Sequence, residues 1–157
     1  MIDVDFKRPF LCSQAAASLL CENGRRGRIV NIGSDAAKIG GAIIASYCAA
    51  KFGVVGLTKV LAGELAPYEV TVNCVCPVSV STTGIGQEVL NWKIGATHQK
   101  LDEILAATAA GIPLKRKSTV ADVVNAVMFF LSDEPAFLTG AALDVEEGYS
   151  APHRSLA

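Results

Sequence analysis

The stretch RIVNIGS, residues 28–34, decides the fold. Its first five residues form a short run rich in β-branched side chains, which is typical of a strand buried on both faces. Gly33 and Ser34 then close the strand and begin a loop. A strand buried on both sides occurs in parallel sheets, so the segments around it should alternate between helix and strand.

That alternation is present along the chain. Leu11, Ala15 and Leu19 recur at helical spacing before the strand, and small residues crowd the early part of a long helical pattern after it. The alternation predicts an α/β fold with a three-layer, doubly wound parallel sheet, Rossmann-like in its order. The expected elements are helices at 10–22 and 46–66, strands at 28–32, 70–75 and 141–145, weaker helical segments at 87–110 and a helix at 118–132.

Three strands make a small sheet, and the helix at 10–22 itself requires an earlier strand to lead into it. No Gly-rich turn that could hold a pyrophosphate occurs near the N-terminus. We therefore expect residues 1–157 to form one partial domain, the C-terminal portion of such a fold. The chain is then either a portion of a larger domain or a shortened variant whose exposed sheet edge a partner covers.

Composition excludes several classes of protein. With 51% hydrophobic and 18% charged residues, most of the chain should pack around a core rather than stay disordered. A net charge of -1 offers no basic face for nucleic acid or for anionic lipid. No apolar run reaches the roughly 18 residues of a membrane span, and the N-terminus lacks a secretory layout. We expect a cytoplasmic protein.

The five cysteines lie in apolar segments, and their number is odd. Buried free thiols in a reducing compartment are the simplest interpretation. Cys74 and Cys76 are too close along a strand to bridge. Zinc needs about four ligands, and His98 and His153 lie near no other candidate, so no metal site is expected.

Tyr47 and Lys51 are four positions apart, which places both side chains on one helix face with Cβ atoms about 6 Å apart. A phenol with a pKa near 10 is a poor base, but a nearby cation favours its ionised form. Ser34, at a strand end where parallel sheets bind ligands, can donate to a carbonyl oxygen or steady the phenol. The alternative is that the pair is the polar edge of an amphipathic helix.

Three motifs occur in a fixed order: Asn-Ile-Gly-Ser at 31–34, Tyr47-x-x-x-Lys51, and Val-Asn-Cys-Val-Cys-Pro at 72–77 followed by Thr82. Together they resemble the short-chain dehydrogenase/reductase family over about residues 4–148, and they correspond to the C-terminal part of that family's domain. The resemblance implies an NAD(P)-dependent oxidoreductase that interconverts a secondary alcohol and a ketone.

The same resemblance implies roles for individual residues. Tyr47 looks like the catalytic acid/base, Lys51 like the residue that lowers the pKa of Tyr47 and binds the nicotinamide ribose, and Ser34 like the residue that holds the substrate oxygen. Residues 83–110 would be the substrate lid. The implied cofactor is NAD or NADP, and the residues that would bind it are Tyr47, Lys51, Pro77, Val80 and Thr82.

The sequence departs from the family pattern in three places. Asp5 stands where an asparagine commonly anchors a proton relay, and its carboxylate would compete for the charge of Lys51. Val78 replaces the glycine after Pro77, which would restrict a turn that needs a positive φ. Glu146 and Glu147 stand where Asp-Gly is common.

The family's N-terminal nucleotide-binding half is absent from the sequence, so we expect residues 1–157 alone to bind cofactor very weakly and not to turn over. The alternative function is a truncated, inactive homologue that acts as an oligomerisation or interaction module. The helices at 10–22 and 46–66 resemble those through which family members pair, so a homodimer or homotetramer is expected in either case.

Overall fold

The computed structural model describes residues 1–24, 26–40, 44–78 and 99–148, together with residues 87, 90, 91, 94, 95 and 97. The chain divides into two compact units. The first comprises Met1–Pro77 and Ala121–Val145, and the second comprises Val78–Val120 and Glu146–Ala157.

The first unit holds a parallel sheet of three strands in the order β1-β2-β3. These are β1 (Gly27–Ile32), β2 (Val70–Pro77) and β3 (Ala142–Val145). Gly27 pairs with Val70 in one ladder, and Cys74 pairs with Ala142 in the other. The expected strands are confirmed, but β2 continues to Pro77, beyond the expected end at residue 75. Pro77 is tolerated because it is the last residue of the strand, where the ladder no longer needs its missing N–H.

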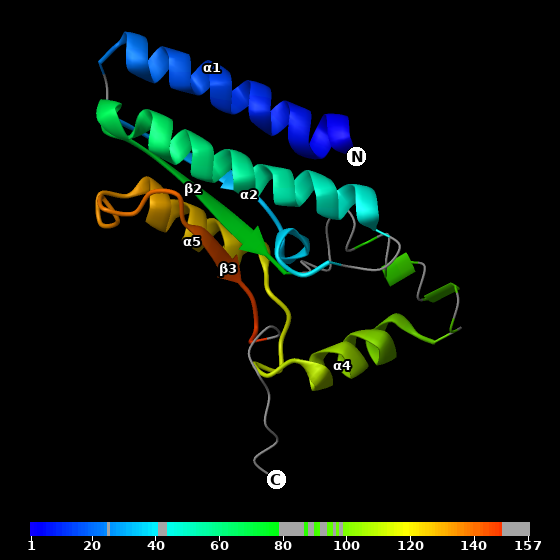
Figure 1. Ribbon diagram of the computed structural model, residues 1–157. Helices are drawn as coiled ribbons and strands as arrows, with labels where there is room; N and C mark the ends of the chain where they lie inside the picture. Colours follow the sequence, from blue (N-terminus) through cyan, green and yellow to red (C-terminus); the bar gives the residue numbers. More distant parts are fainter. Residues whose placement is uncertain are drawn as a thin grey trace. The chain divides into compact units, whose positions relative to one another are not determined.

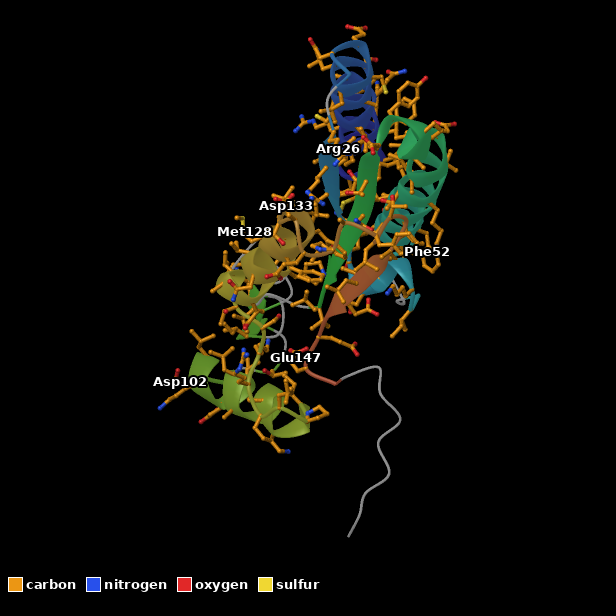
Figure 2. The ribbon with its side chains drawn as sticks, turned by 90° about the vertical axis from the view of Figure 1, so that its left-hand side faces the viewer. Arg26, Phe52, Asp102, Met128, Asp133 and Glu147 are labelled. Carbon is orange, nitrogen blue, oxygen red and sulfur yellow. The ribbon has the colours of Figure 1, made fainter. Side chains whose placement is uncertain are left out.

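Helices cover both faces of this sheet, as the alternating pattern predicted. Figure 1 shows α1 (Arg8–Glu22) and α2 (Ala45–Leu65) along one face and α5 (Val120–Leu131) on the other. Phe52 of α2 and Met128 of α5 accordingly lie on opposite outer sides of the unit (Figure 2). The core between the layers is formed mainly by aliphatic side chains, with Val54, Val70, Val72, Val75 and Phe130 almost completely buried.

A buried chain of hydrogen bonds ties α1, β1 and α2 together. Ser13 Oγ donates to Asn31 Oδ1 at 3.1 Å, and Asn31 Nδ2 donates to Thr58 Oγ1 at 3.1 Å. Thr58 Oγ1 in turn donates to the carbonyl of Val54 at 2.8 Å. Because buried polar groups are costly unless they are paired, this network fixes both helices against the strand that leads to Ser34.

The sequence did not predict the short π-helical turn η1 (Asp3–Lys7) that precedes α1. Its closing bond runs from the Arg8 N–H to the Asp3 carbonyl. Phe6 points from this turn onto Gly53, where an added Cβ would lie 2.9 Å from the Phe6 ring. The glycine in α2 therefore lets the turn approach closely, and Asp5 comes with it.

The second unit contains α4 (Leu101–Gly111). Ser118 Oγ donates to the Val78 carbonyl at 2.9 Å, and the Leu114 N–H donates to the Glu147 carbonyl at 3.4 Å. Gly148 follows with a φ of +86°, which a glycine adopts without strain. The lid expected at residues 83–110 includes α4, but most of its first half lies outside the described residues, and its role stays a prediction.

All five cysteines are free, and Cys48, Cys74 and Cys76 are buried as expected. Cys12 is exposed and Cys21 is only partly buried, so the expectation of burial was wrong for these two residues. The helical pattern in the sequence did not show which residues of α1 face the core. Ser13 is buried there, whereas its neighbour Cys12 is exposed. Within the described residues, no helix is both long enough and apolar enough to cross a membrane.

Candidate active site

The candidate site lies at the carboxyl end of β1, within the first unit. Ser34 follows the strand directly, while Tyr47 and Lys51 come from the first two turns of α2. Asp5 reaches the same place from η1. The fold thus brings together the four side chains to which the sequence analysis assigned chemistry.

Lys51 is the most constrained of the four, with only 9% of the residue exposed. Its Nζ atom lies 5.6 Å from the centroid of the Tyr47 ring, so both side chains do share one face of α2. Nζ also donates to the Ile32 carbonyl at 3.2 Å and lies 3.7 Å from Asp5 Oδ1. The ammonium is therefore held between the end of β1, the phenol ring and a carboxylate.

The pKa of Tyr47 is raised above its ordinary value of 10.0, mainly because burial penalises the charged phenolate. A hydrogen bond with Ser34 lowers this pKa, whereas the charges of Asp5 and Asp35 raise it further. The expectation of a lowered pKa for Tyr47 was therefore wrong in direction. Burial and the two carboxylates outweigh the effects that favour ionisation.

Ser34 is buried, and its hydroxyl already has partners. Oγ donates to Asp35 Oδ1 at 2.8 Å and accepts from the Ala36 N–H at 3.2 Å, which caps the short helix η2 (Asp35–Ala37). Sequence reasoning missed Asp35, although its position next to Ser34 could have suggested it. For Ser34 to donate to a substrate carbonyl, its hydroxyl has to turn away from the Asp35 carboxylate.

A second interaction that the sequence did not reveal joins the end of η2 to β3. Lys38 Nζ donates to Asp144 Oδ2 at 2.7 Å and to the Ala142 carbonyl at 2.8 Å. The two side chains are 106 positions apart in the chain, so no local pattern could have predicted the pair. The contact holds the turn that begins at Ser34 against the far strand of the sheet.

The expected cofactor loop is described only in part. Pro77 ends β2, and Gly33 at the end of β1 donates its N–H to the Val75 carbonyl at 2.8 Å, so the two strand ends are neighbours. Val80 and Thr82 lie outside the described residues. Among the non-glycine residues that the structure describes, only Glu69 and Lys115 have a positive φ, so Val78 does not strain its turn.

Two relatives are similar to this chain over most of its length. They are 2-(S)-hydroxypropyl-CoM dehydrogenase 3 and inactive 2-(S)-hydroxypropyl-CoM dehydrogenase 2, both from Xanthobacter autotrophicus. Each is 41% identical over 90% of this chain. The matches cover 53% and 59% of the two relatives, so the chain spans little more than half of their length.

A family profile and a solved structure agree with these matches. The profile described as enoyl-(acyl carrier protein) reductase matches residues 1–150. The structure of a variant of actinorhodin polyketide ketoreductase with NADPH is 35% identical, with a TM-score of 0.74. It covers 83% of this chain, and the match takes in 49% of the ketoreductase.

Proposed function

The chain belongs to the short-chain dehydrogenase/reductase family, and we propose that it is the catalytic part of an NAD(P)-dependent oxidoreductase that interconverts a secondary alcohol and a ketone. The observation that carries the proposal is the convergence of Ser34, Tyr47 and Lys51 at the carboxyl end of β1. Ligands of open parallel sheets bind at this end of the strands.

In this mechanism Tyr47 transfers the proton. In the reducing direction its hydroxyl gives a proton to the substrate carbonyl oxygen, and in the oxidising direction its phenolate takes the proton of the substrate hydroxyl. Ser34 holds the same substrate oxygen through its hydroxyl. The raised pKa of Tyr47 keeps the phenol protonated at neutral pH, which suits the reduction of a ketone.

The residues present fit the reacting end of a nicotinamide dinucleotide, which supplies or accepts the hydride when bound. The Lys51 ammonium has three donors, of which one goes to the Ile32 carbonyl, so it retains capacity for a ribose hydroxyl. We propose that Tyr47, Lys51, Pro77, Val80 and Thr82 hold the cofactor. The relative solved with NADPH supports this cofactor class.

Replacement of one phenol by a phenyl ring tests the proposal. In the protein expressed from its natural gene, Tyr47→Phe should abolish hydride transfer without loss of cofactor binding. Hydride transfer is measured by the absorbance of the nicotinamide. Tyr68→Phe is the matched control, because Tyr68 is 54% exposed after α2 and should keep full activity. Full activity of Tyr47→Phe would contradict the proposed mechanism.

The second candidate function is a non-catalytic interaction module. Specific observations favour it: Asp5 pairs with Lys51, Asp35 occupies the Ser34 hydroxyl, and one relative carries the name of an inactive enzyme. Calorimetric titration of the protein expressed from its natural gene with NADH and NADPH separates the two functions. Micromolar binding favours the enzyme, whereas no binding favours the module.

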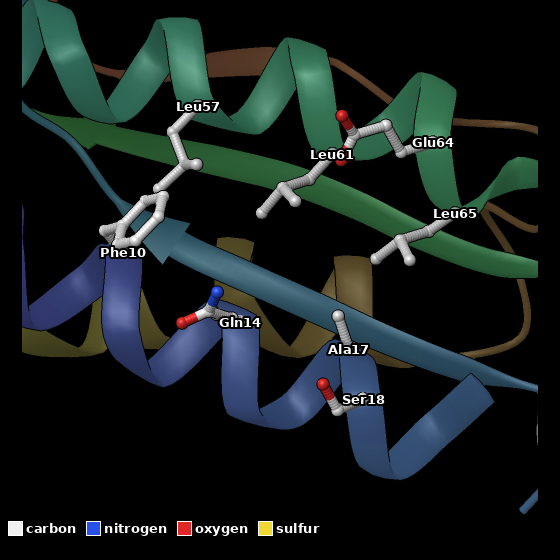
Figure 3. A pocket seen from close by; sticks show the side chains of 8 residues that line it. All are labelled: Phe10, Gln14, Ala17, Ser18, Leu57, Leu61, Glu64 and Leu65. Carbon is white, nitrogen blue, oxygen red and sulfur yellow. The ribbon is translucent and has the colours of Figure 1, made fainter. Parts of the chain in front are cut away.

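We also propose that a second copy of the chain binds across α1 and α2. A groove of about 250 Å³ runs between these helices, with Phe10, Leu57, Leu61 and Leu65 among its lining residues (Figure 3). Exposed apolar side chains continue along both helices, including Leu19 and Val60. A two-helix face of this kind can pair with its own copy about a two-fold axis and bury these side chains in one contact.

Sedimentation measures this association. Phe10→Glu should shift the chain toward monomer, because it places a charge in the groove. Met128→Glu changes an exposed apolar residue of α5, on the opposite face of the sheet, and should leave the association intact (Figure 2). We also propose that the protein is cytoplasmic, as the sequence led us to expect. The five free thiols support a reducing compartment.

A further inference from the structure

The Asp35 carboxylate is a charged group at the candidate site that the proposed mechanism does not use. Asp35 follows Ser34 directly and begins the short helix η2. Its Oδ1 atom accepts two hydrogen bonds of 2.8 Å, one from Ser34 Oγ and one from the Ala36 N–H. Within the described residues Oδ2 accepts none, and the residue is only partly buried. One carboxylate oxygen is therefore open to a ligand.

The lysines around this carboxylate are paired with other acidic side chains. Lys38 Nζ lies 2.7 Å from Asp144 Oδ2, and Lys51 Nζ lies 3.7 Å from Asp5 Oδ1. In the part of the chain that the structure describes, no lysine or arginine lies within 4 Å of the Asp35 carboxylate. Asp35 therefore presents a negative charge without a cationic partner of its own.

Substrate binding takes a donor away from Asp35. In the proposed mechanism Ser34 donates to the substrate oxygen, and its single hydroxyl proton is then no longer available to Asp35 Oδ1. A partly buried carboxylate oxygen that loses a donor costs binding free energy unless another donor replaces it. The replacement comes either from the substrate or from a water molecule that becomes ordered at the site.

The geometry allows the substrate to supply that donor. A substrate oxygen that accepts from Ser34 Oγ at about 2.8 Å lies within about 5.6 Å of Asp35 Oδ1. A hydroxyl or ammonium group on the carbon next to the reacting carbon can bridge this gap with one hydrogen bond. A methyl group there would leave the acceptor without a donor, and a carboxylate would be repelled by Asp35. The charge of Asp35 also raises the pKa of Tyr47, so it is felt at the phenol that transfers the proton.

We propose that Asp35 is a specificity-determining residue and that the substrates carry a hydrogen-bond donor next to the reacting carbon. In the oxidising direction such substrates are vicinal diols and amino alcohols, and in the reducing direction they are α-hydroxy and α-amino ketones. Asp35 accepts the hydrogen bond of that donor when Ser34 turns to the substrate oxygen. This inference rests on the proposed function, because Ser34 and Tyr47 hold the reacting oxygen in it.

Two ketones of the same shape test this selection in the protein expressed from its natural gene, with NADH and NADPH as cofactors. Hydroxyacetone and butanone differ only by a hydroxyl in place of a methyl group. The value of kcat/KM should be at least about tenfold higher for hydroxyacetone, because butanone cannot make the hydrogen bond to the charged group. Pyruvate, which places a carboxylate at the same position, should be the poorest of the three. Equal values for hydroxyacetone and butanone would overturn the proposal.

Asp35→Ala removes the acceptor and should abolish the preference for hydroxyacetone over butanone. A purely structural role of Asp35 would lower both rates and leave their ratio as it is, so an unchanged ratio would contradict the proposal. Asp133→Ala is the matched control. Asp133 is a fully exposed aspartate that pairs with Arg28, and its loss should not change the ratio.

Asp35→Asn covers the case in which the alanine variant fails to fold, because the amide oxygen can still accept from Ser34 and Ala36. It also separates the two kinds of donor. The preference for hydroxyacetone over butanone should largely remain, since a neutral oxygen still accepts from a hydroxyl. Aminoacetone, protonated at about pH 6, should lose at least about tenfold in kcat/KM relative to hydroxyacetone, because the charge is gone. If that ratio does not change, the carboxylate does not select the substrate and the proposal is wrong.

Binding measured without turnover keeps this proposal separate from the proposed function. Saturation-transfer NMR compares hydroxyacetone and butanone in the presence of oxidised cofactor, with which no ketone can be reduced. Reduction of both ketones without a preference would contradict the role of Asp35 while the proposed function stands. Stronger binding of hydroxyacetone that Asp35→Ala abolishes, without any reduction, would support the role of Asp35 and contradict the proposed function. Neither binding nor reduction of either ketone would overturn both.

Discussion

The Lys51 ammonium lies 3.7 Å from the Asp5 carboxylate, with 11% and 21% of the two side chains exposed. Asp5 therefore ties the cation of α2 to η1. Because both groups are largely removed from water, the attraction is screened less than in a surface pair. The charge of Lys51 is thus shared between a carboxylate and the candidate acid/base.

Replacement of that carboxylate by its amide should lower the pKa of Tyr47. In Asp5→Asn the negative charge that disfavours the phenolate is gone, and Lys51 loses its competing partner. The tyrosinate signal followed by ultraviolet absorbance or NMR should move to lower pH. If the protein is active, the pH at which the oxidation rate rises should move in the same direction.

Asp3→Asn provides the control. Asp3 lies in the same turn and pairs with Lys7 at 3.7 Å, but both side chains are well exposed to solvent. Its removal should leave the titration of Tyr47 where it is, because exposed charges are screened. Equal shifts in the two variants would show that the effect comes from net charge and not from the Asp5–Lys51 contact.

Gly33→Ala should destabilise the fold by about 1–3 kcal/mol, the usual cost of forcing an extra methyl group into a packed core. The added carbon would meet both Cys74 and Cys76 sulfurs at less than 3 Å. Unfolding by urea, followed by circular dichroism, gives this free energy. A stability equal to that of the unaltered chain would mean that the end of β1 moves freely over the thiols.

Gly63→Ala in α2 is the matched substitution, and it should change the free energy of unfolding in the opposite direction. Nothing lies within 4 Å of a Cβ built on Gly63, and its φ is not positive. Alanine should therefore raise the free energy of unfolding by about 0.5–1 kcal/mol, because it costs less conformational entropy in a helix than glycine does. The same urea experiment measures it, and a destabilised variant would contradict the open surroundings of this position.

The sequence could predict features set by residues close together in the chain, but not contacts between residues far apart in it. The three strands, the helices around them and the shared face of Tyr47 and Lys51 follow from local periodicity. The contacts of Lys38 with Asp144 and of Gly33 with the two sulfurs join distant segments, so periodicity carries no signal for them. The pKa of Tyr47 went against the expectation mainly because of burial, which depends on the assembled fold and not on a local pattern.

Thr58→Val tests the buried hydrogen-bond network. Valine fills nearly the same space, but it removes the acceptor for Asn31 Nδ2 and leaves that donor buried without its partner. An unpaired buried donor costs about 1–3 kcal/mol, so the free energy of unfolding should fall by that amount in this variant. Urea unfolding measures this loss. Thr71→Val, at a partly buried position of β2, is a control that should change stability by less.

The stability of the fold should fall at alkaline pH in a way that Tyr47 controls. The pKa of this phenol is raised in the folded protein above its ordinary value of 10.0, so the folded state holds the proton more tightly than the unfolded chain. The resulting stabilisation is present below pH 10 and is lost as the pH rises from there through the folded pKa. Urea unfolding measured from neutral to strongly alkaline pH should show a decline that is shallower in Tyr47→Phe. Because the other tyrosines titrate in both proteins, the difference between the two curves isolates Tyr47, and parallel curves would show that its pKa is not raised by folding.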